Sequence, residues 1–338
     1  MRLLTSSPTL NTTLSIALGR LAGSLALCLF STAWQAHAST RVFAWGAGTF
    51  VTTDSSDLYD YGQSIVPTTL TNGVLASGGW RHSLALKSDG TLMGWGDDTL
   101  GQIDYPALSN YIAVACGGVH SLGLLSNGIV EAWGDDFYGQ ATAPTNLSDV
   151  VAIACGLYHS LALRADGTVA AWGTSTNINQ IGTDPNYGQA LVPGDLSNVV
   201  AIAAGGGHCL ALRTNGTVVA WGAGTAAVST NLAYGQSTVP ANLTNVIQIA
   251  AGLAHSLALV GSGPPVLKVQ LTAPAFTTNG FSLSCPVRNG RVYSLEYKNS
   301  LTNAAWTSLP LKAGIYGTMR LTDPGPFSAQ RFYRVQQW

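Results

Sequence analysis

Residues 150–173, VVAIACGLYHSLALRADGTVAAWG, decide how this chain folds. Val151 and Ile153, and then Leu161 and Leu163, alternate with small residues, which is the period of a β-strand. Between the second run and Trp172, the sequence Ala-Asp-Gly-Thr at 165–168 supplies the positive φ that a tight hairpin turn needs. The stretch therefore predicts a small antiparallel sheet whose last strand carries the large side chain of Trp172.

The same unit recurs along the chain, with a Gly-x-x-His at its centre and, in most copies, a Trp-Gly and a Gly-Gln after it. The histidines recur every 38 to 49 residues, and about 40 to 50 residues is typical of one propeller blade. A catalytic residue is needed once, so a residue present in every unit is expected to be structural. These repeat residues are His82, His120, His159, His208 and His255, and Trp45, Trp95, Trp133, Trp172 and Trp221.

One such unit cannot bury its own faces, and radial stacking into a β-propeller solves that problem. Residues 42–46 hold only the Trp-Gly half of a unit, whereas 246–260 hold only the Gly-x-x-His half. Together they make one blade, and pairing the two ends would remove exposed sheet edges. The sequence thus predicts an all-β protein, a propeller of about five blades whose ends pair to close the ring, followed by a small β-sandwich.

Segments such as Gly156–Leu163 and Ala132–Gln140 resemble the regulator of chromosome condensation repeat, and the resemblance covers roughly 41–260. The short units that end in proline are also similar to secreted bacterial propellers that inhibit β-lactamases. That resemblance implies a non-catalytic binding platform, on which aromatic and acidic loop residues of one face hold a protein. Nucleotide exchange and chromatin binding are not expected, because no wedge is inserted in a blade and no basic tail is present.

Residues 1–38 are expected to be a secretory signal peptide, with an apolar run at 21–34 and an Ala36-His37-Ala38 cleavage site. Removing it leaves 13 basic and 16 acidic residues, because Arg2 and Arg20 are lost from the full chain's 15 and 16. Without a basic stripe, nucleic-acid binding has no electrostatic basis. We expect a secreted or cell-surface protein, the periplasm included, with no membrane span after cleavage.

The repeat stops at about residue 260, and the composition changes there. Residues 39–260 form the expected propeller, 261–267 a Gly/Ser/Pro linker and 268–338 a small β-sandwich tail module. The tail resembles modules at the ends of secreted proteins from planctomycete- and verrucomicrobia-type bacteria. Its role as an attachment or sorting element is an expectation from that resemblance alone.

No enzyme chemistry is expected, because the sequence contains no nucleophile elbow, P-loop, zinc signature or paired-carboxylate cleft. Neither a metal nor another cofactor is predicted. The five repeated histidines could form a ring around a metal. The favoured interpretation is that they tie adjacent strands together by hydrogen bonds. The serines that follow the histidines point to the opposite face of the strand, which argues against a Ser–His pair within one unit.

Cysteines at equivalent positions of neighbouring units leave two interpretations open. Cys116 and Cys155 are predicted to be small buried fillers, and a bridge between them is the alternative in an oxidising compartment.

Variable residues on the repeated frame are the candidates for partner binding, because aromatic and arginine side chains dominate binding hot spots. We expect an unknown protein partner and a monomeric chain. The runner-up is a carbohydrate-binding or cell-surface adhesin that binds a glycan, and an unrecognised hydrolase is third. Calcium binding by the Asp pairs is not favoured, because their spacing lacks the EF-hand pattern. The candidates are Trp80, Arg81, Asp97, Asp98, Asp135, Asp136, Phe137, Tyr138, Leu157 and Tyr158.

Overall fold

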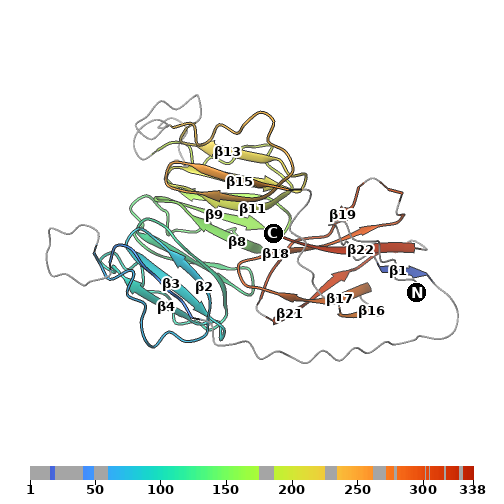
Figure 1. Ribbon diagram of the computed structural model, residues 1–338, viewed down its shortest axis with the longest axis horizontal. Coiled ribbons are helices and arrows are strands. Elements are labelled where there is room, and N and C mark those ends of the chain that lie inside the picture. Colours follow the sequence, from blue (N-terminus) through green and yellow to red (C-terminus); the bar gives the residue numbers. More distant parts are fainter. Residues whose placement is uncertain are drawn as a thin grey trace.

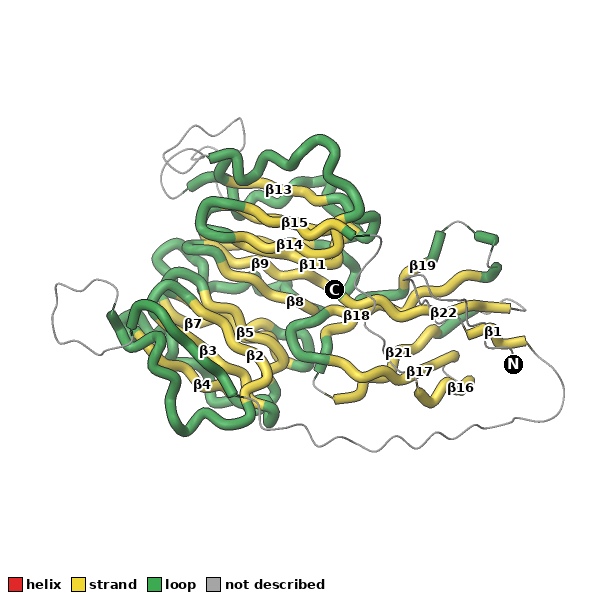
Figure 2. The backbone as a smooth tube through the Cα atoms, viewed as in Figure 1, coloured by secondary structure: helices red, strands yellow, loops and turns green. Residues whose placement is uncertain are grey.

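The computed structural model contains only strands as regular elements in the residues that it describes (Figure 2). The described residues are 16–19, 41–48, 60–174, 186–224, 234–261, 272–277, 280–300, 302–303, 305–315, 317–326 and 330–338. The predicted cleavage site at 36–38 and nearly all of the 261–267 linker lie outside them. Within this part of the chain no helix is long and apolar enough to cross a membrane.

Four three-stranded antiparallel sheets follow one another along the chain and form the complete blades (Figure 1). Their strands are β2 (Gly73–Gly78), β3 (His82–Lys87) and β4 (Leu92–Gly96); β5 (Tyr111–Cys116), β6 (His120–Leu125) and β7 (Val130–Gly134); β8 (Val150–Cys155), β9 (His159–Arg164) and β10 (Val169–Gly173); and β11 (Val199–Ala204), β12 (His208–Arg213) and β13 (Val218–Gly222). A fifth sheet has two strands, β14 (Val246–Ala251) and β15 (Ser256–Val260). The prediction of propeller blades is therefore confirmed.

The third blade shows how the sequence sets the local structure. Gly167 has a φ of 81° in the hairpin turn, and Thr168 donates its backbone N–H to a carboxylate oxygen of Asp166 at 2.9 Å. This turn fixes the register, so that Val169 lies opposite Leu163 and Gly173 opposite His159. The alternation read from the sequence is therefore the alternation of the sheet.

The repeated tryptophans join consecutive blades. Each indole of the four complete blades is only 4 to 7% exposed, and its N–H donates to the backbone carbonyl of a Gln in the loop that precedes its blade. In the second to fourth blades that loop starts from the blade before, so one hydrogen bond fixes both the indole and the crossing chain. The pairs are Trp95–Gln63, Trp133–Gln102, Trp172–Gln140 and Trp221–Gln189, at 2.8, 2.9, 3.0 and 2.9 Å.

The predicted closing blade is not formed. In the described residues β15 pairs with β14 alone, and the 42–46 segment is not a strand. Trp45 is 84% exposed, and His255 is exposed at the last sheet. In Figure 1 the first blade lies at the lower left and the last sheet at the top, so the blades follow an arc. These two repeat residues therefore lack the structural role predicted for them, since no neighbouring blade covers them.

Two further sheets lie beyond the arc and share one hydrophobic core, which includes Phe281, Leu283, Leu295 and Tyr333. The first sheet consists of β16 (Thr272–Thr277), β17 (Gly280–Val287) and β21 (Gly317–Asp323). The second consists of β18 (Val292–Lys298), β19 (Thr307–Ser308), β20 (Lys312–Ala313), β22 (Gln330–Gln337) and the N-terminal β1 (Ile16–Gly19), which pairs with β22.

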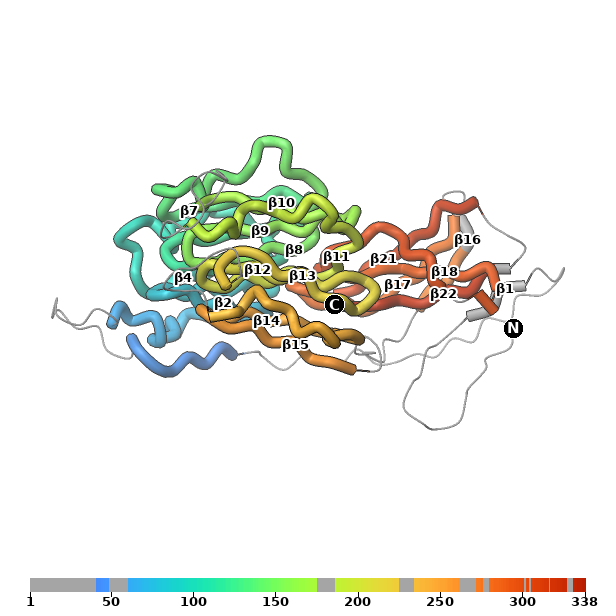
Figure 3. The backbone as a smooth tube through the Cα atoms, turned by 90° about the horizontal axis from the view of Figure 1, so that it is seen from above, coloured from blue at the N-terminus to red at the C-terminus, as the bar shows by residue number. Residues whose placement is uncertain are grey.

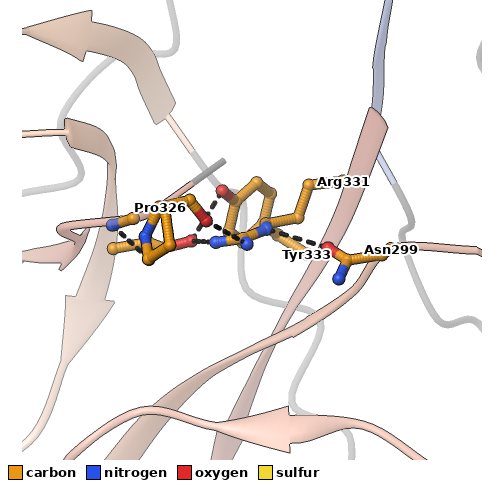
Figure 4. Close-up of polar contacts among 6 residues, drawn as sticks. Asn299, Pro326, Arg331 and Tyr333 are labelled. Atoms are coloured by element: carbon orange, nitrogen blue, oxygen red, sulfur yellow. Dashed lines mark hydrogen bonds and ion pairs between the residues drawn. The ribbon is translucent and has the colours of Figure 1, made fainter. Parts of the chain in front are cut away.

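A buried ion pair links these two sheets (Figure 4). Arg331 of β22 contacts Asp323 of β21 at 2.5 Å, and the Tyr333 hydroxyl donates to the same carboxylate oxygen at 2.8 Å. Burial, followed by this hydrogen bond, raises the pKa of Tyr333. Arg331 also donates to the side chain of Asn299. Because Asp323 is only 1% exposed, removing one partner would leave a buried charge unpaired.

The tail sheets pack against the hairpin end of the blades. The Leu311 N–H donates to the Ala165 carbonyl, and the Asn289 side chain donates to the Ile112 carbonyl, both at 2.9 Å. Gly290 lies against Leu75 of the first blade. Three consecutive blades therefore touch this module, which braces the arc.

Candidate interaction face

The loops that carry the variable residues all emerge at one end of the blades. In a three-stranded antiparallel sheet, the first connection and the exit of the third strand lie at the same end, opposite the hairpin. The Gly-x-x-His loops and the loops after Trp-Gly therefore share a face, which we call the loop face. The tail module packs on the hairpin end, and Figure 1 shows it to the right of the blades.

Neighbouring Gly-x-x-His loops are hydrogen-bonded to one another, so the loop face has a continuous backbone frame. Trp80 N–H donates to the Gly117 carbonyl at 3.2 Å, and Gly118 N–H donates to the Gly156 carbonyl at 3.2 Å. Gly206 N–H continues the series toward the last sheet. Side chains at the variable positions thus stand on a fixed platform.

The first glycine of each loop is required by the close approach of the next loop. A Cβ on Gly79 would lie 2.4 Å from the His82 ring and 2.6 Å from the Gly117 carbonyl oxygen. Neither group can move freely, because the ring is buried and the carbonyl belongs to the neighbouring frame.

We therefore expect Gly79→Ala to lower the free energy of unfolding by about 2–3 kcal/mol, the cost of overpacking a rigid site. A Cβ on the adjacent Gly78 would meet no atom within 4 Å, and the backbone there has no positive φ. Gly78→Ala is therefore the matched control and should stay within about 0.5 kcal/mol of the parent. Urea titration of both variants measures the difference. Equal losses in the two would show that the steric argument is wrong.

The repeated histidines bridge neighbouring blades. In the four complete blades, each imidazole Nε2 lies within hydrogen-bonding distance of the residue that follows the histidine of the next unit. The imidazoles are therefore hydrogen-bonded as predicted, but these bonds join neighbouring blades and not adjacent strands of one sheet. The pairs are His82–Ser121, His120–Ser160, His159–Cys209 and His208–Ser256, at 2.9, 2.9, 3.2 and 3.0 Å.

The hydrogen-bond donors and acceptors of the Ser–His pairs show that these pairs are structural. The Ser121 hydroxyl donates its one proton to the Gln102 carbonyl at 2.8 Å, and Ser160 donates likewise to Gln140. The hydroxyl oxygen must therefore accept from the imidazole Nε2–H, the reverse of what a general base would do. The sequence did not reveal this pairing, because the partner lies in the next repeat and only the packing of one blade against the next brings it close.

Burial keeps these histidines neutral. Desolvation lowers the pKa of His120 and of His159 to about 3, and the pKa of His82 and of His208 to about 4. For His82, the carboxylates of Asp97 and Asp98 oppose this shift without cancelling it. A neutral Nε2–H tautomer agrees with the donor role assigned above.

Aromatic side chains from the second and third blades gather on the loop face. The Phe137 and Tyr138 rings meet edge to face at 4.9 Å, and Tyr138 meets Tyr158 of the next blade at 5.3 Å. Phe137 is 82% exposed. The structure therefore brings three of the predicted binding residues into one aromatic cluster. Leu157, the residue before Tyr158, is half-buried against Gly118.

A second group lies on the first blade. The Arg81 guanidinium stacks 4.7 Å from the Trp80 ring and 4.8 Å from the Tyr61 ring, and it donates to the Tyr61 hydroxyl at 3.0 Å. Trp80 is 46% exposed. Tyr61 was not among the predicted residues, although it occupies the Tyr of the Tyr-Gly-Gln motif and could have been found there.

The four predicted aspartates hold their own loops. Asp97 is 5% exposed and accepts from Thr99 N–H, so the structure corrects its assignment as a surface contact. Asp98 accepts from Ile103 N–H at 3.1 Å. Asp135 accepts from the Gln140 side chain, and Asp136 accepts from the Thr142 hydroxyl. Short Asp side chains favour such turn contacts over binding at a distance.

The four cysteines within the described residues have free thiols, so the bridge between Cys116 and Cys155 is not formed. Cys116 Sγ donates to the Ser77 carbonyl and Cys155 Sγ to the Ala115 carbonyl, both at 3.3 Å. Burial raises the pKa of Cys116 to about 12. The buried-filler prediction is confirmed for Cys116, whereas Cys155 is half-buried, and each thiol makes a weak hydrogen bond to the blade before.

Fold and site together define a repeat propeller in which the histidines of the complete blades, and the tryptophans of the second to fourth, join each blade to a neighbouring one. The four complete blades match the regulator of chromosome condensation (RCC1) repeat, at residues 75–102, 111–140, 150–178 and 199–226, so this part of the chain is an RCC1-like β-propeller. No curated protein sequence matches the chain.

Solved structures with similar folds include RCC1 propellers. Yeast RCC1 (Prp20), crystallised bound to Kap60, is 25% identical over 53% of this chain and 52% of that chain, with a TM-score of 0.40. Prp20p from Saccharomyces cerevisiae is 21% identical over 55% of each chain, with a TM-score of 0.42. Human WBSCR16 is 18% identical over 77% of this chain and 86% of its own, with a TM-score of 0.37. The chain spans about half the length of the yeast chains.

Proposed function

We propose that this protein is a secreted, non-catalytic binding propeller that holds a protein partner on its loop face. The observation that carries the proposal is the aromatic cluster of exposed Phe137 and Tyr138 with half-buried Tyr158, built across two blades on a hydrogen-bonded frame. Large rigid aromatics contribute binding area at little cost in side-chain entropy.

Two further observations support a protein partner. The Trp80–Arg81 stack adds a cation beside aromatic surface on a neighbouring loop, and Trp and Arg are the residue types most enriched at hot spots. The RCC1 repeats are consistent with a scaffold for protein interactions. Secretion rests on the expected signal peptide at residues 1–38.

We expect Phe137→Ala and Tyr158→Ala each to weaken partner binding at least tenfold, without lowering the melting temperature. The reason is that both rings lie at the surface cluster and neither fills the blade core. The measurement is a pull-down from the host's envelope and culture medium, followed by titration of the captured protein. Ile129→Ala is the control, since Ile129 is 47% exposed at the hairpin after β6.

Equal loss of binding with Ile129→Ala would place the partner elsewhere. A parallel loss of melting temperature in Tyr158→Ala would show that the ring is structural. Enrichment of polysaccharide, with no protein in the captured fraction, would favour a carbohydrate-binding adhesin instead.

A further inference from the structure

The last sheet of the arc presents an open, apolar strand edge. Leu257 and Leu259 of β15 are 60% and 55% exposed. Their equivalents in the complete blades are buried against the next blade: Leu84 and Leu86 are 0% exposed and pack with Tyr111, Val114 and Trp133. Among the described residues β15 pairs with β14 alone, and an exposed apolar strand with an unpaired edge is a template for another strand.

A cavity of about 420 Å³ lies beside this edge. Its lining includes Leu210, Val218, Gln236, Leu243 and Leu257. The Gln236 carbonyl accepts from the Ser256 hydroxyl at 2.7 Å, as the Gln189 carbonyl accepts from the Cys209 thiol one blade earlier. In that earlier blade the same Gln carbonyl also accepts the indole N–H of the third strand. The cavity is thus placed where a tryptophan of a completed fifth blade would lie.

The matching strand exists in the chain, at the other end of the arc. Residues 43–46, Phe-Ala-Trp-Gly, carry the Ala-Trp-Gly of β7, β10 and β13. Phe43 and Trp45 are 76% and 84% exposed. The segment is tied to the first blade, where the Ser64 hydroxyl donates to the Ala47 carbonyl at 2.6 Å. Figure 3 shows this segment in blue and β15 in orange, in separate places along the lower side of the arc.

The tail module opposes closure within one chain. It contacts the first three blades through Leu75, Ile112 and Ala165, on the end opposite the loop face. The C-terminal Trp338 packs against the cluster that spans the third and fourth blades. Moving the first blade to the last sheet would break these contacts, so one molecule keeps two complementary surfaces that do not meet.

We propose that the Val42–Gly46 segment of a second copy of this chain completes the fifth blade. It adds antiparallel to β15, with its indole in the cavity beside Gln236. The register follows from β12 and β13, in which Cys209 lies opposite Trp221 and Leu210 opposite Ala220. By the same spacing, Ser256 faces Trp45 and Leu257 faces Ala44 of the second copy. Complementary patches at two places on one chain associate as a reciprocal dimer or head to tail.

Light scattering after gel filtration of the full chain tests this proposal. We expect assemblies of at least two 35.0 kDa chains at micromolar concentration, and an association at least tenfold weaker for Trp45→Ala. Ile129→Ala, an exposed apolar residue outside both surfaces, should associate like the parent. A single-chain mass at all concentrations, or no effect of Trp45→Ala, would overturn the proposal.

Cysteine cross-linking distinguishes a second copy from the chain's own segment. Chains with Ala44→Cys are mixed with chains with Leu257→Cys, and mild oxidation should give a disulfide-linked species of twice the chain mass. The native thiols of Cys116, Cys209 and Cys285 are buried, and both chains carry Cys155→Ser because Cys155 is only half-buried. If the double variant instead forms its bridge within single chains, and the mixed chains give none, the ring closes on itself and the proposal fails.

Discussion

Lowering the pH from 7 to 5 is expected to reduce the free energy of unfolding by several kcal/mol. The cause is the row of interblade histidines, whose pKa values in the folded chain are about 3 for His120 and His159 and about 4 for His82 and His208. Their value in an unfolded chain is about 6.5. Between these limits the unfolded chain binds more protons than the folded one.

The sign of the effect follows from linkage. Stability rises with pH wherever the unfolded state holds more protons, so the full stability is present above about pH 6.5. It falls as the pH drops below 6.5, and the fall stops when the folded histidines themselves titrate at about pH 3 to 4. At pH 5 each histidine that stays neutral costs about 2 kcal/mol, so four give an upper bound of about 8 kcal/mol. A typical domain has about 5–15 kcal/mol in total.

Urea unfolding monitored by tryptophan fluorescence at pH 7, 6 and 5 measures this dependence. His120→Gln is the informative control, since an amide can donate to Ser160 and does not titrate in this range. It should lose stability at pH 7 and show a dependence on pH that is shallower by about a quarter. A flat profile between pH 7 and 5 in the parent chain would contradict the neutral histidine network.

The blades could be predicted from the sequence because the residues that determine each unit lie within that unit. The hairpin at 165–168 sets its register locally, and alternating residues select the strand, so one unit can be interpreted without its neighbours. The prediction that Cys116 is a buried filler was also correct, since a small apolar residue at a repeated position has few other roles. Contacts within a repeat are therefore the accessible part of this fold.

Contacts between repeats were harder to foresee. The bond from His120 to Ser160 and the aromatic contact from Tyr138 to Tyr158 depend on how far one blade turns from the next, and no local pattern encodes that angle. The prediction that the ring closes was wrong for the same reason. The motif identified Phe-Ala-Trp-Gly at 43–46 as a third strand, but the path of the arc and the bracing by the tail module decide whether it reaches β15.

Replacing Trp133 by alanine is expected to lower the free energy of unfolding by about 3–5 kcal/mol, the range for large aromatics truncated in cores. The indole is 7% exposed, packs edge to face on Tyr105 and Tyr111, and donates to the Gln102 carbonyl. The variant therefore loses buried apolar area. It also removes one of the donors to the Gln102 carbonyl, which joins two blades.

Trp45 offers the matched control, because it occupies the same place in the repeat and is 84% exposed. In dilute protein, Trp45→Ala should change the free energy of unfolding by no more than about 0.5 kcal/mol, as exposed substitutions usually do. Thermal and urea unfolding of both variants give the comparison directly. If Trp133→Ala costs under about 1 kcal/mol, the indole does not fasten the blades. If Trp45→Ala costs as much as Trp133→Ala in protein dilute enough to be single chains, the arc closes within one molecule, because only a covered indole can contribute that much.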